Sequence, residues 1–311
     1  MHFFNSSPVA SNQFIYESDT GIKLYLKRED LLATGVSGNK FRKLKYNIAF
    51  AKANDYKTLL TFGGAYSNHI AATAKAGKIT GLRTIGIIRG EELGADLPQT
   101  LQQNETLRLA YAQGMRFKFI SRSLYREKGT AAFRESVLNE FEPFYEVPEG
   151  GTNGLAIKGC KEILNASDAT FNYICCPAGT GGTAAGIIEA SNNTQHVLVF
   201  SALKGDFLKQ EILRFTTKKN WTLITDYHFG GYARINLNLI EFINTFKAKH
   251  KIQLDPIYTG KMMYGLTDLI QKGYFSKNTR ILAVHTGGLQ GIAGINARLK
   301  KQGAKLIDYD G

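Results

Sequence analysis

The sequence is poor in the residues that define several large classes of protein. Its 311 residues include only 3 cysteines and 6 prolines. Cys160, Cys175 and Cys176 have neither the spacing of metal ligands nor the even number of a disulfide framework. Two of them are adjacent in an apolar stretch, which predicts small buried side chains and a reducing compartment. No segment is of low complexity, so the sequence does not indicate disorder.

Long apolar runs and a one-sided basic surface are also missing. No run approaches membrane-spanning length, and residues 1–13 lack a basic segment followed by an apolar one. We therefore expect a soluble, cytoplasmic protein without a membrane partner. The formal net charge is +13, but the basic residues are scattered and form no stripe interleaved with aromatic residues. A solvated surface explains them best, steering of anionic ligands stays open, and no nucleic-acid partner is expected.

What remains is an ordinary globular composition, 43% apolar and 21% charged, with 32 glycines. The length suits two domains, and a turn-rich break at 149–154 predicts a boundary there. Short apolar stretches alternate with helical patterns, which predicts parallel βαβ units and an α/β fold. We expect strands at 14–16, 22–27, 57–62, 84–88, 116–120, 172–176, 197–201 and 281–285. We expect helices from 40 and after 260, and at 71–78, 95–112, 130–141, 155–164, 183–192, 237–249 and 289–302.

One lysine stands at an unusual place. The segment Ser-Gly-Asn-Lys at 37–40 precedes a helix whose apolar residues recur with helical spacing, so Lys40 falls in the first turn, with Asn39 as the expected N-cap. The helix dipole there favours anions, so the ammonium should lose its proton readily. A neutral amine is what a Schiff-base lysine needs. The alternative is an ordinary solvated lysine.

A glycine-rich turn follows the strand expected at 172–176. Crowded backbone N–H groups, two hydroxyls and a helix N-terminus suit a phosphate. The residues concerned are Gly179, Thr180, Gly181, Gly182 and Thr183. The pattern G-x-G-x-x-A also fits a dinucleotide, but the next strand lacks the acidic residue that would hold a ribose. A phosphate monoester is favoured, with a dinucleotide or a merely tight turn as alternatives.

Two further turns carry polar side chains. The loop at 63–69 places Ser67, Asn68 and His69 at a helix start, where side-chain donors and N–H groups suit a carboxylate or phenolate oxygen. An ordinary N-cap by Ser67 or Asn68 is the alternative. Thr286 follows the last expected strand, at the edge of the sheet where ligands of open α/β folds gather.

Taken together, the segment at 37–40, the loops at 63–69 and 179–183 and the His-Thr-Gly-Gly at 285–288 resemble fold-type II pyridoxal-phosphate enzymes. Their order resembles the branch that holds 1-aminocyclopropane-1-carboxylate deaminase and D-cysteine desulfhydrase, over residues 14–303. The resemblance implies two open parallel-sheet domains of the tryptophan synthase β-like architecture. Residues 1–47 and 156–311 would form the large cofactor-binding domain, and 48–155 the small domain. It also implies a homodimer.

The resemblance further implies roles toward pyridoxal 5'-phosphate. Lys40 would form the Schiff base, and Gly179, Thr180, Gly181, Gly182 and Thr183 would hold the phosphate. Asn68 would bind the phenolic oxygen, and Thr286 would meet the pyridine nitrogen. A hydroxyl cannot keep that nitrogen protonated as a carboxylate would, so the ring is a weaker electron sink and elimination is favoured over transamination.

On the substrate side, the resemblance implies that Ser67 and its neighbours Asn68 and His69 receive a carboxylate. Two segments, at 231–232 and 255–261, resemble those that carry the family's active-site tyrosines, so Tyr232 and Tyr258 would line the substrate, with core packing as the alternative. Lys40 would remove the Cα proton, and Tyr258 or Ser67 would assist the leaving group.

Two departures from the deaminases narrow the choice of substrate. Those enzymes carry a glutamate directly after the tyrosine where this chain has Thr259, and they lack a threonine at the position of Thr286. Both differences favour α,β-elimination on a small amino acid such as D-cysteine, giving pyruvate, ammonia and sulfide. Deamination of 1-aminocyclopropane-1-carboxylate to 2-oxobutyrate is the first alternative. A protein that binds the cofactor without turnover is the second.

Overall fold

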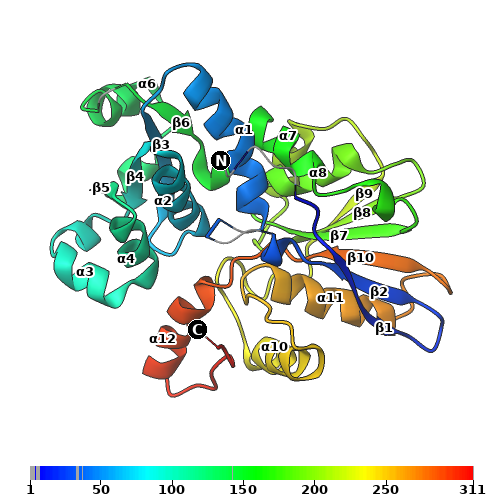
Figure 1. Cartoon of the computed structure of the whole chain (residues 1–311). Helices are drawn as coiled ribbons and strands as arrows, with labels where there is room; N and C mark the ends of the chain where they lie inside the picture. The colour runs from blue at the N-terminus through cyan, green and yellow to red at the C-terminus, as the bar shows by residue number, and fades with distance from the viewer. Residues whose placement is uncertain (1–3, 5–7, 33–34, 37, 142, 311) are drawn as a thin grey trace. The chain divides into compact units, whose positions relative to one another are not determined.

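The computed structural model describes residue 4 and residues 8–32, 35–36, 38–141 and 143–310, so Ser37 lies outside the described residues. The chain divides into two compact units (Figure 1). The first unit is formed mainly by Leu44–Asn153, and the second by Ser7–Lys43 and Gly154–Gly311. The sequence placed these boundaries slightly later, after residues 47 and 155. The earlier boundary falls inside α1 (Asn39–Ala53), so Lys40 belongs to the second unit.

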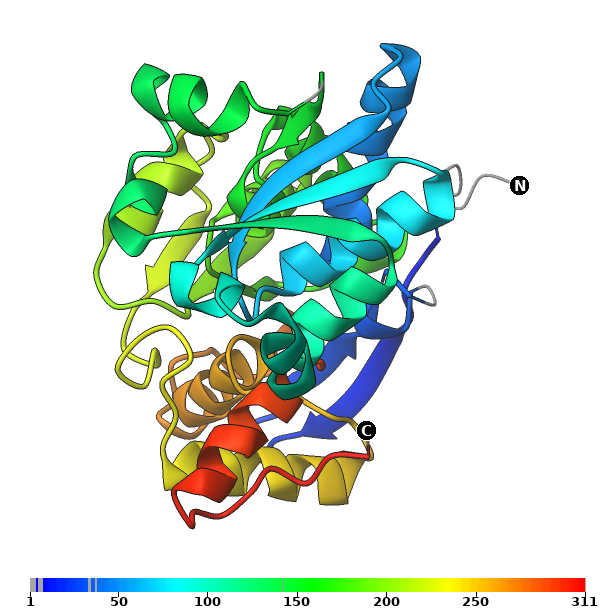
Figure 2. The ribbon, with the colours of Figure 1, turned by 90° about the vertical axis from the view of Figure 1, so that its left-hand side faces the viewer.

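The first unit is built on a parallel sheet of four strands in the order β5-β4-β3-β6. Figure 2 shows β3, β4 and β5 side by side, in light blue to green-cyan. The strands are β3 (Thr58–Gly64), β4 (Arg83–Arg89), β5 (Met115–Ile120) and β6 (Tyr145–Val147), and the helices are α2 (Asn68–Thr80), α3 (Leu97–Gln103), α4 (Glu105–Ala112), α5 (Arg122–Arg126) and α6 (Ala131–Phe133). Neighbouring residues of one strand face opposite cores: Ile87 packs beneath α5 and α6, whereas Ile88 packs beneath α2 and α4.

The second unit is built on six strands in the order β1-β2-β10-β7-β8-β9. All neighbours are parallel except β1, which was expected as a strand at 14–16 but pairs antiparallel with β2 at the edge of the sheet, whereas the prediction was of a parallel sheet. The strands are β1 (Asn12–Glu17), β2 (Lys23–Lys27), β7 (Tyr173–Ala178), β8 (His196–Ser201), β9 (Trp221–Ile224) and β10 (Arg280–Val284), and the helices are α7 (Gly154–Lys161), α8 (Gly182–Ala190), α9 (Phe207–Leu213), α10 (Leu237–His250), α11 (Thr259–Gln271) and α12 (Gly291–Lys301).

Helices cover both faces of this six-stranded sheet, with α7 and α8 on one side and α10 and α11 on the other (Figure 1). The alternation of strand side chains produces the two cores. Cys176 packs with α7 and α8, whereas its neighbour Cys175 faces α10 and α11. All three cysteines are free and fully buried, which confirms the prediction of small core side chains.

Several elements differ from those expected. The predicted helix at 95–112 is two helices, because Asn104 is extended (φ −122°) and its side chain caps α4 by accepting from the N–H of Leu107. The predicted helix at 130–141 is the short α6 followed by a π-helical turn at Arg134–Leu138. The strands β6 and β9 and the helices α5 and α9 were not predicted.

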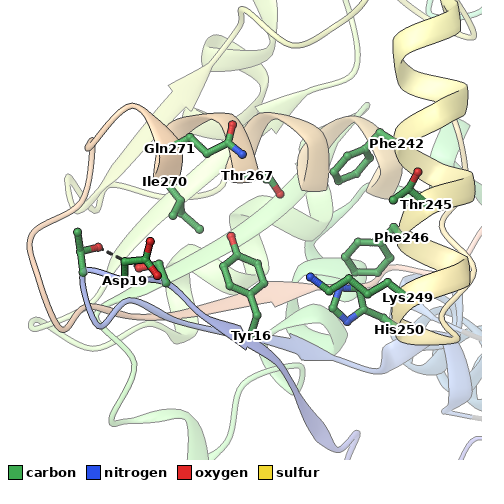
Figure 3. Close-up of a pocket in the computed structure, with 12 residues that line it drawn as sticks. Tyr16, Asp19, Phe242, Thr245, Phe246, Lys249, His250, Thr267, Ile270 and Gln271 are labelled. Carbon is green, nitrogen blue, oxygen red and sulfur yellow. Dashed lines mark hydrogen bonds between the residues drawn. The ribbon is translucent and has the colours of Figure 1, made fainter.

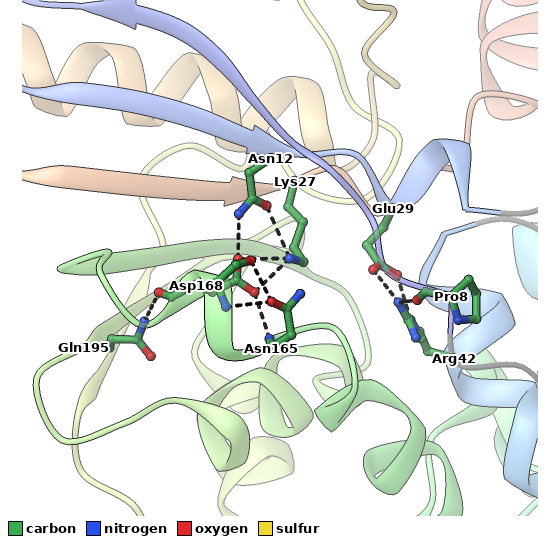
Figure 4. A network of polar contacts seen from close by, with 9 residues as sticks. Pro8, Asn12, Lys27, Glu29, Arg42, Asn165, Asp168 and Gln195 are labelled. Carbon is green, nitrogen blue, oxygen red and sulfur yellow. Dashed lines mark hydrogen bonds and ion pairs between the residues drawn. The ribbon is translucent and has the colours of Figure 1, made fainter.

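Two buried ion pairs fix the start of α1 and of β7 (Figure 4). Arg42 donates to both carboxylate oxygens of Glu29, at 2.9 and 3.0 Å, while the backbone oxygen of Glu29 accepts from the N–H of Gly38. Lys27 donates to both carboxylate oxygens of Asp168, at 2.8 and 3.0 Å. Because these side chains are at most 1% exposed, they anchor the segments beside Lys40 and before β7.

Among the helices of the described residues, none combines the length and the apolar character that a membrane span requires.

Candidate active site

The turn that leads into α1 packs directly against the loop after β10. Gly38 has φ +63°, and a Cβ placed on it would lie 2.1 Å from the backbone oxygen of Thr286. The N–H of Asn39 donates to that oxygen at 3.3 Å. Only glycine suits this position, because it combines a left-handed backbone with a close approach. The packing therefore brings Lys40 and Thr286, both predicted from the sequence, into one site.

The amine of Lys40 is held beside Asn39. Lys40 Nζ donates to Asn39 Oδ1 at 3.1 Å, and Asn39 Nδ2 donates to Thr183 Oγ1 at 2.8 Å. The expected N-cap role of Asn39 is therefore wrong: Asn39 is the first residue of α1, and its side chain links Lys40 to the glycine-rich loop.

The pKa of Lys40 is lowered, which is the direction that the sequence predicted. Although part of its surface stays accessible, burial of the amine, followed by repulsion from Lys43, lowers the pKa of Lys40 to about 7. A substantial fraction of the amine is therefore neutral near neutral pH. Burial supplies most of this shift, whereas the sequence argument relied on the helix dipole.

The glycine-rich loop has the geometry of an oxyanion cradle. Gly181 has φ +79° and is the N-cap of α8, but it offers no side chain to accept from the free N–H groups of the first turn. That turn also contains no acidic residue. The hydroxyl of the buried Thr183 and that of the exposed Thr180 border the loop. These features fit a phosphate group at the loop from Gly179 to Thr183.

Lys43, one turn after Lys40, was not predicted from the sequence. It is 2% exposed, and its Nζ donates to Thr180 Oγ1 at 3.4 Å. Burial lowers the pKa of Lys43 to about 8. Its spacing of three residues from Lys40 places both amines on neighbouring faces of one helix, which is the signal that could have identified it.

Tyr258 and Tyr232 come together beside the same loop. Their ring centroids are 6.3 Å apart, with the planes at 63°. A Cβ placed on Gly179 would lie 3.2 Å from the hydroxyl oxygen of Tyr258, so this phenol borders the start of the cradle. The two tyrosines therefore pack against each other at the predicted site, and Tyr232 remains 45% exposed.

The position of each tyrosine is fixed by a buried charge. Asp255 Oδ1 accepts from the N–H of Tyr258 at 2.7 Å, while Oδ2 accepts from the N–H of Thr259 at 2.8 Å. Lys261 Nζ donates to the backbone oxygen of Gly231 at 2.8 Å, directly before Tyr232. Sequence reasoning missed both charges. An aspartate two to four residues before a helix start is a known turn and cap signal that could have found Asp255.

Ser67, Asn68 and His69 lie in the first unit, at the start of α2. Ser67 is the N-cap, as one interpretation of the sequence held, and its Oγ accepts from the N–H of Ile70 at 3.4 Å. A hydroxyl that accepts this bond can still donate one. Asn68 Oδ1 is buried without a hydrogen-bond partner among the described residues. His69 is 1% exposed, and its Nε2 is 2.8 Å from Thr61 Oγ1, so its side chain is part of the interior.

A cavity of about 490 Å³ lies elsewhere in the second unit (Figure 3). Tyr16, Phe246 and His250 are among its lining residues, and the turn that precedes β2 closes one side. Because β2 runs parallel to β7 and β10, this turn marks the sheet edge opposite the loops that carry Thr183 and Thr286. None of the residues predicted for the active site lines this cavity.

Comparison with known proteins identifies the family of this chain. A family model described as "Pyridoxal-phosphate dependent enzyme" matches residues 9–287. The protein belongs to this family, and it is an enzyme that depends on pyridoxal phosphate.

Two relatives and one solved structure are similar to this chain over most of its length. The chain is 33% identical over 297 residues to a "Bifunctional D-cysteine desulfhydrase/1-aminocyclopropane-1-carboxylate deaminase, mitochondrial" of Arabidopsis thaliana, covering 88% of this chain and 74% of the relative. It is 31% identical to a "Putative 1-aminocyclopropane-1-carboxylate deaminase" of Pyrococcus abyssi, covering 88% and 87%. A solved "ACC deaminase homologue" superposes with a TM-score of 0.78 at 28% identity, covering 94% of this chain and 93% of the other. The α/β architecture with two parallel-sheet bodies is that of the fold-type II enzymes.

Proposed function

We propose that this protein catalyses a pyridoxal-phosphate-dependent α,β-elimination on a small amino acid similar to D-cysteine. One observation carries the proposal: in the second unit, a lysine whose pKa is lowered to about 7 adjoins an uncapped glycine loop and a pair of tyrosines. A deprotonated amine, an oxyanion cradle and a phenol are the groups that such an elimination requires.

The cofactor would be held by residues of the second unit, which we propose as the cofactor-binding domain, with the first unit as the small domain. Lys40 would bind the aldehyde carbon, and the N–H groups from Gly179 to Thr183 would hold the phosphate. Lys43, beside Thr180, would contribute a positive charge to that phosphate. Thr286 would donate or accept at the pyridine nitrogen, and Asn68 would bond the phenolic oxygen.

When bound, pyridoxal phosphate withdraws electrons from an amino acid joined to its aldehyde carbon and so makes the Cα proton acidic. Lys40 Nζ, once the substrate amine has replaced it at the aldehyde carbon, would take that proton, and its lowered pKa of about 7 leaves a substantial fraction of the amine neutral near pH 7. Ser67, with the N–H groups of its neighbours Asn68 and His69, receives the substrate carboxylate. Tyr258 donates a proton to the leaving sulfur, and Tyr232 packs against its ring. Water then completes the conversion to pyruvate and ammonia.

The choice of D-cysteine over the cyclopropane substrate rests on Thr259 and Thr286. A deaminase is expected to carry a carboxylate at this position, and this chain has the neutral Thr259 instead. Thr259 is fully buried at the start of α11, and its N–H donates to Asp255. The hydroxyl of Thr286 favours prompt loss of a β-substituent. Relatives whose names include each activity share this chain's family, so the deaminase remains the second candidate.

Purified enzyme supplied with pyridoxal phosphate should release sulfide and pyruvate from D-cysteine. We expect kcat/KM for D-cysteine to exceed that for 1-aminocyclopropane-1-carboxylate by about a hundredfold, because the site has Thr259 in place of the carboxylate expected of a deaminase. Sulfide, pyruvate and 2-oxobutyrate are measured in parallel, with L-cysteine as the stereochemical control. Production of 2-oxobutyrate without sulfide would instead support the deaminase. A cofactor spectrum that no amino acid changes would support a binding protein without turnover.

Uptake of the cofactor should depend on pH with a midpoint near 7, because only the neutral form of Lys40 attacks an aldehyde. As the pH rises through the lowered pKa, the neutral fraction and the uptake rate both increase and then level off. The rate is followed as the rise in visible absorbance after pyridoxal phosphate is mixed with cofactor-free protein. The matched variant Lys43→Met should move the midpoint upward, since the Lys43 charge lowers the Lys40 pKa. A midpoint near the ordinary lysine value of about 10.4 would contradict this account.

We further propose that the protein acts in the cytoplasm as a homodimer, with an amino acid as its small-molecule partner and neither nucleic acid nor membrane as a partner. The support is the resemblance to fold-type II enzymes and the scattered positions of the basic residues. Sedimentation of the holoenzyme tests the dimer.

A further inference from the structure

The first unit contains a second cavity, of about 510 Å³, at the carboxyl ends of its strands. Gly64 and Arg89, the last residues of β3 and β4, both line it, and α5 follows β5 at the same edge. Its volume is within the range of small-molecule sites, and this edge of a parallel sheet is where ligands bind. The cavity belongs to a different unit from the phosphate loop of Gly179 to Thr183.

The cavity contains more positive than negative charge. Four cationic and two acidic side chains line it. Two of the cations are neutralised, because Arg122 pairs with Glu92 and Lys128 pairs with Glu149. Within the described residues, the two remaining guanidinium groups, those of Arg89 and Arg126, form no ion pair.

Arg89 is solvent-exposed and lies at the wall of the cavity. Its guanidinium carbon lies 5.7 Å from the centroid of the Tyr125 ring. A Cβ placed on Gly64 would lie 3.5 Å from Arg89 Nη2, so the group also borders the end of β3. A guanidinium stacked on an aromatic face is already ordered, and less entropy is lost when it binds a carboxylate or phosphate.

The hydroxyl of Tyr125 is the second, independent sign of a ligand. Tyr125 is 3% exposed and lines the cavity, and its hydroxyl lies beside the Glu149 carboxylate without meeting it in good hydrogen-bond geometry. The Glu149 carboxylate is close enough that burial and this charge raise the pKa of Tyr125, so the phenol keeps its proton. Because Glu149 also pairs with Lys128 and is poorly placed to accept from the phenol, an incoming oxyanion would offer this buried donor a better acceptor.

We propose that this cavity binds a compact oxyanion, a carboxylate or phosphate group of a small metabolite, through Arg89, Arg126 and the hydroxyl of Tyr125. The site is additional to the cofactor and does not depend on the proposed reaction. Gly64, Ala65 and Tyr66 line it immediately before Ser67, so the bound anion contacts the segment that leads into α2.

The test is calorimetric titration of the holoenzyme, at low ionic strength, with citrate and with inorganic phosphate. The holoenzyme already carries its cofactor, but citrate can also bind where Ser67 is proposed to receive the substrate carboxylate. Binding is therefore assigned to this cavity by its weakening in the cavity variants, and the stronger of the two probes identifies the carboxylate or phosphate class. Arg89→Gln should weaken binding by about tenfold or more, since it removes a charge-assisted pair. Tyr125→Phe should weaken it by about fivefold.

Arg116→Gln is the matched control, because it removes the same charge from an exposed position of β5 outside the cavity. It should leave the affinity unchanged, and thermal melting of each variant confirms that it is folded. The proposal is overturned if neither anion binds saturably, or if Arg89→Gln binds both as tightly as the Arg116→Gln control.

Discussion

Replacement of Lys40 by alanine should lower turnover of D-cysteine by at least about a thousandfold, within the range lost when a general base is removed. The variant lacks the amine that binds the aldehyde and takes the Cα proton. Because the Gly179–Thr183 loop and Lys43 are unchanged, the variant should still bind pyridoxal phosphate, but with the spectrum of a free aldehyde.

Lys52→Ala is the control for this experiment. Lys52 lies on the same helix, in its exposed last turn, so its loss should leave both turnover and the cofactor spectrum as they are in the parent protein. Activity in Lys40→Ala comparable to that in Lys52→Ala would contradict the assignment of Lys40.

Replacement of Asp168 by alanine should lower the free energy of unfolding of the second unit by about 3–5 kcal/mol. The substitution leaves the Lys27 ammonium, itself 0% exposed, without a counter-charge. It also removes acceptors for Asn12 Nδ2, at 2.7 Å, and for the N–H of Asn165, at 2.9 Å (Figure 4). A buried charge that loses its partner keeps its desolvation cost without the attraction that offset it.

The chain provides a specific probe for this unfolding. Its single tryptophan, Trp221, lies in β9 of the second unit, so tryptophan fluorescence in urea follows that unit alone. Asp310→Ala is the control, because Asp310 pairs with Lys247 while 92% exposed, and surface pairs contribute little. If the free energy of unfolding of Asp168→Ala is within about 1 kcal/mol of that of Asp310→Ala, the buried pair does not anchor β2 to the segment before β7.

Local signals were enough to predict most of the fold and to select candidate residues for the site. Apolar runs bounded by glycine located β2, β3 and β7, and the glycine turns located Lys40, Gly181 and Thr286. These features depend on residues adjacent in the chain. Where a local signal was ambiguous, the prediction was wrong: Asn39 has the residue type of an N-cap but is the first residue of α1.

The missed features depend on contacts between distant segments. Thr180 is 137 residues from Lys43 in the chain, and no local pattern indicates that one will donate to the other. The strand β9 has only half-buried residues and lies at the edge of its sheet, so its apolar signal is weak. Arg89 resembles any exposed arginine in the sequence, and only the fold places it against Tyr125.

The most direct test of the central claim is to treat the yellow holoenzyme with borohydride and to map the lysine that carries the cofactor by peptide mass spectrometry. Reduction makes the bond between amine and aldehyde permanent, so the label stays on the residue that formed it. The account predicts that the label is on the peptide containing Lys40, and that Lys40→Ala carries none. A label on another lysine, or a colourless protein that takes up no pyridoxal phosphate, would contradict it.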